Sequence, residues 1–286
     1  MELWINLTVN GLATGMLIFL LASGLTLIFG LMHVLNFAHG GLFAWGAFAG
    51  VWFYSITSSF ILALLGAILT GLVLGFIMER LIIKPVYGNT VQQILITLGF
   101  MLVLSEMLKV VWGPNQIAAK VPPALAGSWE FGDVLIIKYR FFLIIMGLLI
   151  FAIFYFILKR TKIGLIVRAG VINNEMVQAL GINIKRMFLF VFMTGAALAA
   201  FGGALMAPYS GVIYAEMGMD FMILAFIVVV IGGMGSFPGS LFAAALVGLA
   251  GSYMAYYVPD LSLAVNMIIM VLVLFFRPQG LFAVKG

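Results

Sequence analysis

The sequence predicts an all-α membrane protein, a polytopic helical bundle of eight or nine spans with broken or re-entrant segments. Its 286 residues are 65% hydrophobic and only 8% charged, with a mean hydropathy of +1.27, whereas soluble domains carry about 25% charged residues. A globular core could not hide this much apolar surface, so the solvent must be lipid. The length accommodates eight or nine helices of roughly 20 residues each. We expect one transmembrane domain over residues 1–286, with no soluble domain attached.

Apolar stretches bounded by charges and turn residues mark the expected helices. The first stretch is too long for the core of a signal peptide and is preceded by no Lys or Arg, so we expect a retained span with an outside N-terminus. The stretch at 221–231 has only 11 residues, which favours a broken or re-entrant helix and leaves both span counts open. The expected spans are 5–30, 36–54, 60–78, 91–112, 141–158, 187–207, 221–231, 241–257 and 261–276.

Basic residues between the spans set the expected orientation. Six of the 14 Lys and Arg residues lie in a polar island at 159–186. Arg80 and Lys84 follow the third span, and Arg277 and Lys285 follow the last. The positive-inside rule places all three groups in the cytoplasm, with nine crossings and a cytoplasmic C-terminus. The net charge of +5 therefore reflects topology and does not indicate nucleic acid.

The segment 113–140 is the expected external loop. It contains Pro122 and Pro123, followed by Trp129 and Glu130. Its three basic residues count mildly against this side of the membrane, although external loops do carry some positive charge. We interpret the segment as a surface loop with a short hairpin. The alternative is a docking surface for an external partner, since it combines paired prolines with aromatic residues.

Two glycine-rich corners, at 29–44 and 231–243, resemble each other. The match suggests an internal duplication with both copies in the same orientation. Glycine and proline between apolar halves are also typical of interrupted helices at transport sites. The aligned residues are Gly40, Leu42, Phe43 and Ala44 in the first corner and Gly239, Leu241, Phe242 and Ala243 in the second. Our candidates for the substrate pathway are Asn36, His39, Gly40, Gly235, Pro238 and Gly239.

Asn36 and His39 are polar residues of the first corner, beside His33. They lie three residues apart and share one face if the corner is helical. An ionisable residue inside a membrane is a functional candidate by default. The alternative is that both residues cap or staple a bent helix through hydrogen bonds, and the sequence leaves both interpretations open.

The remaining charged groups offer no catalytic arrangement. Glu106 and Lys109, three residues apart in one span, are expected to neutralise each other. Glu216 and Asp220 are either plain loop acids or groups that face a cationic substrate at the external mouth. The chain has no cysteine and two histidines, so we expect no metal site. It contains no P-loop motif. We therefore expect no enzyme and no cofactor in this chain, and any ATP must bind to another subunit.

The polar island at 159–186 has the periodicity of an amphipathic helix. Arg168 and Glu175 lie away from its apolar line, and Gly181 is a plausible C-cap. Such a helix either lies on lipid headgroups or binds a protein, and its sparse charge favours a protein partner. The apolar line, in steps of four, three, four and four, is Leu165, Ala169, Ile172, Met176 and Leu180.

At these residues the chain resembles the permease subunits of branched-chain amino-acid ABC transporters, in particular the LivH-type subunit. The resemblance covers nearly the whole chain. Three stretches carry it: 24–30 running into 36–40, 168–183, and 232–240 followed by 277–282. The second stretch is similar to the cytoplasmic coupling loop of the family. The resemblance thus implies four candidate residues for ATPase coupling, which are Arg168, Glu175, Ala179 and Gly181.

The resemblance implies a permease subunit of an ATP-driven importer that moves branched-chain amino acids across the plasma (inner) membrane of a prokaryote. The implied partners are a second permease subunit, two cytoplasmic ATPase subunits that bind the ATP, an external substrate-binding protein and the lipid bilayer. Gly41 stands where the family usually has an acidic residue after its His-Gly pair. The alternatives are a permease for urea, short amides or another amino acid, or a stand-alone secondary transporter.

Overall fold

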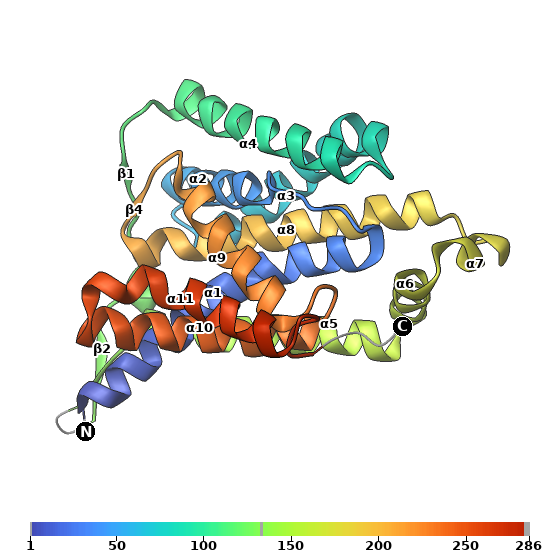
Figure 1. Cartoon of the computed structure of the whole chain (residues 1–286). Coiled ribbons are helices and arrows are strands. Elements are labelled where there is room, and N and C mark those ends of the chain that lie inside the picture. Colours follow the sequence, from blue (N-terminus) through green and yellow to red (C-terminus); the bar gives the residue numbers. More distant parts are fainter. Residues whose placement is uncertain (1, 132–133, 283–286) are drawn as a thin grey trace.

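The computed structural model describes residues 2–131 and 134–282, which form a bundle of α-helices with short strands at one end (Figure 1). The two strand pairs are β1 (Ile117–Ala118) with β4 (Val212–Ile213), and β2 (Ser128–Phe131) with β3 (Val134–Ile137), both antiparallel. The helices are α1 (Glu2–Met32), α2 (His39–Thr57), α3 (Phe60–Met78), α4 (Thr90–Trp112), α5 (Lys138–Arg160), α6 (Lys162–Ile172), α7 (Asn174–Ala179), α8 (Ile184–Ser210), α9 (Met217–Gly232), α10 (Phe237–Tyr257) and α11 (Ser262–Phe276).

Each apolar stretch of the sequence forms a helix. Within the described residues, six helices are long and apolar enough to cross a membrane, and two shorter apolar segments lie in α9 and α11. The short stretch at 221–231 became α9, which has 16 residues. The boundaries of α3 match the expected span 60–78 because Ser59 caps the start through Leu62 N, and because charged Glu79 begins a π-helical turn at Glu79–Ile83. The expected all-α bundle is therefore confirmed.

The two ends of the bundle have different chain segments. The N-terminal turns of α1 and the strands lie at one end, and α6 and α7 project from the other (Figure 1). The hairpin expected within 113–140 is present as β2–β3. The pairing of β1 with β4 additionally ties this loop to the connection between α8 and α9. Lys285, one of the cations used to orient the chain, lies outside the described residues.

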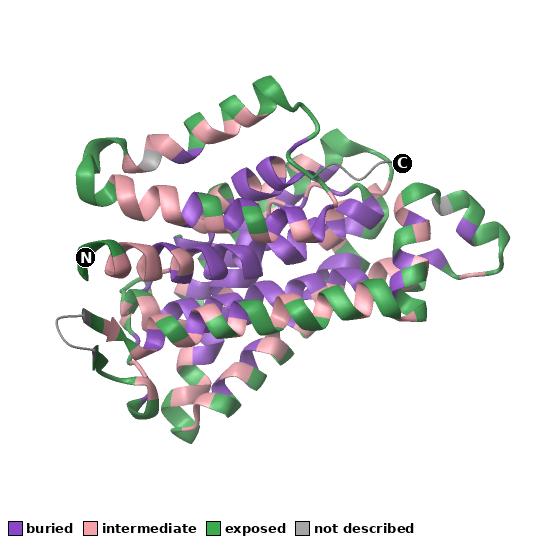
Figure 2. Cartoon of the chain, turned by 90° about the horizontal axis from the view of Figure 1, so that it is seen from below, coloured by how far each residue is buried: buried purple, intermediate pink, exposed green. Residues whose placement is uncertain are grey.

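Helix α1 is the centre of the bundle. Its residues from Gly15 to Thr26 are all buried, whereas α6 and α7 at the projecting end carry many exposed residues (Figure 2). Glycines let its neighbours approach closely, since a Cβ on Gly11 would lie 2.8 Å from the Leu249 Cα of α10. Glycines four residues apart, such as Gly11 with Gly15 and Gly46 with Gly50, lie at such helix contacts, as expected for helices that pack in lipid without a hydrophobic driving force.

Candidate functional site

The first corner is a re-entrant turn. After α1 ends at Met32, the chain is non-helical through Asn36, and α2 begins at His39. The His39 Nε2 atom lies 3.1 Å from the Leu21 backbone oxygen, and Leu21 precedes the end of α1 by about three helical turns, roughly 16 Å. The chain therefore leaves α1, turns back, and starts α2 deep inside the bundle. The expected interruption at this corner is confirmed.

The two polar candidates of this corner contact different helices. Asn36 is 1% exposed and its Nδ2 lies 4.0 Å from Met78 Sδ at the end of α3, while His39 is fully buried against α1. The helical corner that would give them a shared face is absent at Asn36, because Asn36 precedes α2 and lies in non-helical backbone. The Asn36 Oδ1 and His39 Nδ1 atoms are buried and have no hydrogen-bond partner. Each residue therefore carries one unused polar atom in the core.

Thr97 of α4 holds the first corner in place, and nothing in the sequence indicates this role. Its side chain is fully buried, and its Oγ1 accepts a hydrogen bond from the Phe37 backbone N–H at 3.3 Å. The same hydroxyl lies 2.7 Å from the Gln93 backbone oxygen, to which it donates. A threonine within an apolar span gives no indication of its distant partner, and only the tertiary packing reveals it.

Glycines at the start of α2 allow other helices to approach. Gly40 packs directly against the Gly218 backbone at the start of α9, and a Cβ at Gly40 would lie 2.8 Å from Met222 Cβ. A Cβ at Gly41 would lie 2.7 Å from Leu104 Cδ1 of α4. Side chains of α4 therefore close the position of Gly41 in this chain, and the packing leaves little space for a carboxylate there.

The second corner joins α9 to α10 and is held by backbone and hydroxyl groups. Gly235 has a φ of +86°, which favours glycine, and the Gly239 N–H donates to the Ser236 hydroxyl at 3.2 Å. Ser240 follows, and its hydroxyl lies 2.6 Å from the Thr26 hydroxyl of α1. The two corners meet, since a Cβ on Gly30 would lie 3.0 Å from the Gly235 Cα. The internal duplication itself stays a prediction.

The polar island forms two helices rather than one. The single amphipathic helix expected across 165–180 is wrong, because the Asn173 side chain accepts a hydrogen bond from the Met176 N–H and starts α7 as a new helix. Gly181 has a φ of +82° and follows Leu180, the C-cap of α7, as expected for a residue that terminates a helix. Glu175 and Ala179 lie in α7 and are both exposed.

Most of the apolar line on α6 and α7 faces outward. Leu165 is 60% exposed and Leu180 is 74% exposed, although these are the residues that an isolated amphipathic helix would bury. Ile172 and Met176 are exposed to a similar degree. An exposed apolar row of this kind on an otherwise polar projection is typical of a protein contact surface.

Arg168 of α6 lies beside the second corner. It lines a cavity of about 350 Å³ together with Lys159 of α5 and with Gly235 and Pro238. The structure thus joins a coupling candidate to two pathway candidates that are far apart in the sequence. The other coupling candidates, on α7 and after it, do not line this cavity.

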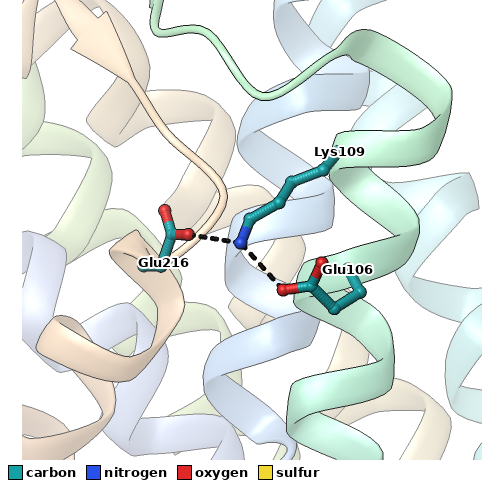
Figure 3. Close-up of polar contacts among 3 residues, drawn as sticks. All are labelled: Glu106, Lys109 and Glu216. Carbon is teal, nitrogen blue, oxygen red and sulfur yellow. Dashed lines mark hydrogen bonds and ion pairs between the residues drawn. The ribbon is translucent and has the colours of Figure 1, made fainter.

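A charged triad links α4 to the start of α9 at the opposite end (Figure 3). The Lys109 Nζ lies 2.8 Å from Glu106 Oε1 and 2.7 Å from Glu216 Oε1. The expected neutralisation of Glu106 by Lys109 is confirmed, but Glu216 is an ion-pair partner rather than a plain loop acid. The hydrogen bond from Lys109 lowers the pKa of Glu216.

Asp220 accepts a hydrogen bond from the Tyr214 hydroxyl at 2.7 Å. Among the described residues, no group of three His, Cys, Asp or Glu side chains is placed to hold a metal ion.

Comparison with known proteins identifies the family. A family model described as the permease component of the branched-chain amino acid transport system matches residues 7–274. The chain belongs to this family. It is 30% identical to the high-affinity branched-chain amino acid transport system permease protein BraD of Pseudomonas aeruginosa, over 96% of this chain and 94% of BraD. It is 28% identical to LivH of Escherichia coli, over 95% of this chain and 93% of LivH.

A solved structure shows a similar fold. PsaBC from Streptococcus pneumoniae in complex with Fab superposes with a TM-score of 0.51 and 14% sequence identity, over 94% of this chain and 91% of the matched chain. At this identity the likeness concerns the fold alone. Family membership and the apolar helices together make this chain a multi-pass protein of the cell membrane.

Proposed function

We propose that this chain is a permease subunit of an ATP-driven importer for branched-chain amino acids. It would act with a second permease subunit, two ATPase subunits that bind the ATP, and an external substrate-binding protein. The names of its relatives support the transport of branched-chain amino acids. The chain itself has no P-loop motif, so the energy source lies in a partner, and we infer no enzymatic activity here.

The exposed apolar row on α6 and α7 carries this proposal. Leu165, Ile172, Met176 and Leu180 form a contact surface on a projection at one end of the bundle. An ATPase subunit that covers this row would remove from water the apolar area that the isolated chain leaves exposed. The positive-inside rule supports a cytoplasmic location for this end, which contains the island and Arg277. The same rule places the β2–β3 hairpin outside, within reach of a binding protein.

Movement of α6 would reach the substrate pathway through the second corner. Arg168 and Pro238 line one cavity, and the second corner contacts α1 through Ser240 and Gly235. A shift of α6 on closure of the ATPases would therefore displace the start of α10 against α1. Packed helices that have two arrangements transmit such shifts as alternating access.

The first corner would form part of the pathway in the open state. Asn36 Oδ1 and His39 Nδ1 are buried without partners in this arrangement, and an unpaired buried polar atom destabilises the state that contains it by about 1–3 kcal/mol. Opening of the corner would expose both atoms to water or to the backbone groups of a passing amino acid. The two corners would move at backbone contacts where no side chain stands in the way. These contacts are made by Gly40, Gly235 and Gly239.

Reconstitution of the complete transporter tests this proposal. Proteoliposomes with both permeases, the ATPases and the binding protein should accumulate labelled leucine only when ATP is supplied to the ATPases. Labelled urea and acetamide serve as competing cargoes, and the expectation is that neither accumulates. Leucine uptake by this chain alone, driven by an ion gradient and independent of ATP, would show a secondary transporter instead.

A further inference from the structure

A basic pocket lies at the α6–α7 end of the bundle. The residues that line it belong neither to the exposed apolar row on α6 and α7 nor to the two corners. Its volume is about 470 Å³. Four cations line it from two segments far apart in the sequence: Arg80 and Lys84 follow α3, and Lys185 and Arg186 lie in the first turn of α8. Four of the chain's 14 basic residues thus surround one hollow, which concentrates positive potential there.

These cations have no acidic partner within the described part of the chain. Both ion pairs found there involve Lys109 at the opposite end. Glu79 is the one acid that lines the pocket, but it is only 3% exposed, and its Oε1 accepts a hydrogen bond from the Tyr87 hydroxyl at 2.7 Å. The pocket therefore presents an excess of positive charge to an incoming anion.

Exposed apolar residues directly follow pocket-lining residues in the sequence. Leu81 is 67% exposed beside Arg80, and Phe190 is 51% exposed beside Leu189, which lines the pocket. The Arg80 guanidinium lies 5.7 Å from the centre of the Phe76 ring, which is also exposed. Cations above lipid-facing apolar side chains match an amphiphile whose phosphate is joined to acyl chains better than they match a soluble anion.

We propose that this pocket binds the phosphate headgroup of an anionic phospholipid, with the acyl chains against Leu81 and Phe190. Basic pockets at the cytoplasmic ends of transmembrane helices recognise such headgroups through charge. A bound lipid would hold the segment after α3 against the start of α8, because each segment supplies two of the four cations. This proposal depends on membrane embedding alone and not on the transported substrate.

Lipid titration of the full-length chain in neutral detergent tests the proposal by native mass spectrometry. The probes are short-chain phosphatidylglycerol and, as the uncharged counterpart, phosphatidylcholine. We expect one tightly held phosphatidylglycerol. The Lys185→Gln/Arg186→Gln variant should bind it about 25-fold more weakly, because each basic side chain near an anionic headgroup contributes roughly fivefold. The Arg160→Gln/Lys162→Gln variant removes the same charge at the same end but outside the pocket, and it should bind like the wild type.

Several results would overturn the proposal. One is equal loss of phosphatidylglycerol in the control pair, which would show a general charge effect. Equal affinity for phosphatidylcholine, or equally tight binding of free glycerol phosphate, would show that the pocket does not select an anionic lipid. Unchanged lipid binding in the Lys185/Arg186 variant, together with loss of ATPase co-purification, would assign the pocket to a protein contact instead.

Discussion

Replacement of Thr97 by Val should destabilise the first corner with little change of shape. The valine fills the same space but removes the hydroxyl that accepts the Phe37 N–H at 3.3 Å. The Gln93 backbone oxygen loses the Thr97 hydroxyl as a donor, but it keeps the backbone hydrogen bond that it accepts within α4. The cost is therefore that of one unpaired, part-buried donor, at most about 1–3 kcal/mol, and no cavity term adds to it.

Chemical denaturation of the purified chain in detergent micelles measures this loss. Thr97→Ser keeps the hydroxyl and should retain most of the stability of the wild type. Thr194→Val is the matched control, because its hydroxyl donates only to Phe190 O within α8 at 2.8 Å, and its effect should stay within about 0.5 kcal/mol. Equal stability of Thr97→Val and the wild type would refute the role of this hydrogen bond. Equal losses in Thr97→Val and Thr97→Ser would refute it as well.

Three further predictions concern the coupling helices, the first corner and the charged triad. Gly181→Ala forces a side chain into a left-handed backbone with a φ of +82°, at a cost of about 1–2 kcal/mol. In this variant ATP hydrolysis should continue while substrate uptake falls. Full uptake by an Arg168/Glu175 double mutant would count against docking of an ATPase at α6 and α7. Asn36→Ala and His39→Ala should each alter uptake in proteoliposomes without reducing co-purification of the ATPases, and unchanged uptake in both would leave them a purely structural role. Glu216→Gln should lower the melting temperature slightly at pH 7, because it breaks an exposed ion pair. Lys109 holds the pKa of Glu216 below its ordinary value of 4.5. The difference in melting temperature between the wild type and Glu216→Gln should therefore be complete above pH 4.5 and disappear as the pH falls through the lowered pKa. A difference that persists in strong acid would contradict the ion-pair explanation.

The helices were predictable because their signal is local. Residues 60–78 contain no charged residue and are bounded by Ser59 and Glu79, and the helix that forms there has those limits. Gly181 was likewise readable as a helix end, because few residues other than glycine adopt a positive φ. The break between α6 and α7 at Asn173 was not predictable. Ile172 and Met176 keep helical spacing across it, and this spacing gives no indication that the Asn173 side chain caps a new helix.

The partners of the polar residues were not predictable from the sequence. Glu106 and Lys109 lie within one helical turn, so their pairing follows from spacing, but the bond from Lys109 to Glu216 spans more than 100 residues. Asn36 and His39 are close in sequence and diverge to α3 and α1. The choice among distant partners depends on how the helices pack, and spacing along one segment carries no information about that packing.

The sequence alone determined that the chain is a membrane-embedded helical bundle and that its basic loops share one side, because lipid selects apolar composition and the positive-inside rule acts on each loop separately. Only the tertiary structure decided that α2 starts deep inside the bundle, that Arg168 lies beside the second corner, and that four cations surround one pocket. These features depend on close contacts between helices, which glycine and alanine permit at many positions. The final fit of all the helices selects which of those contacts form.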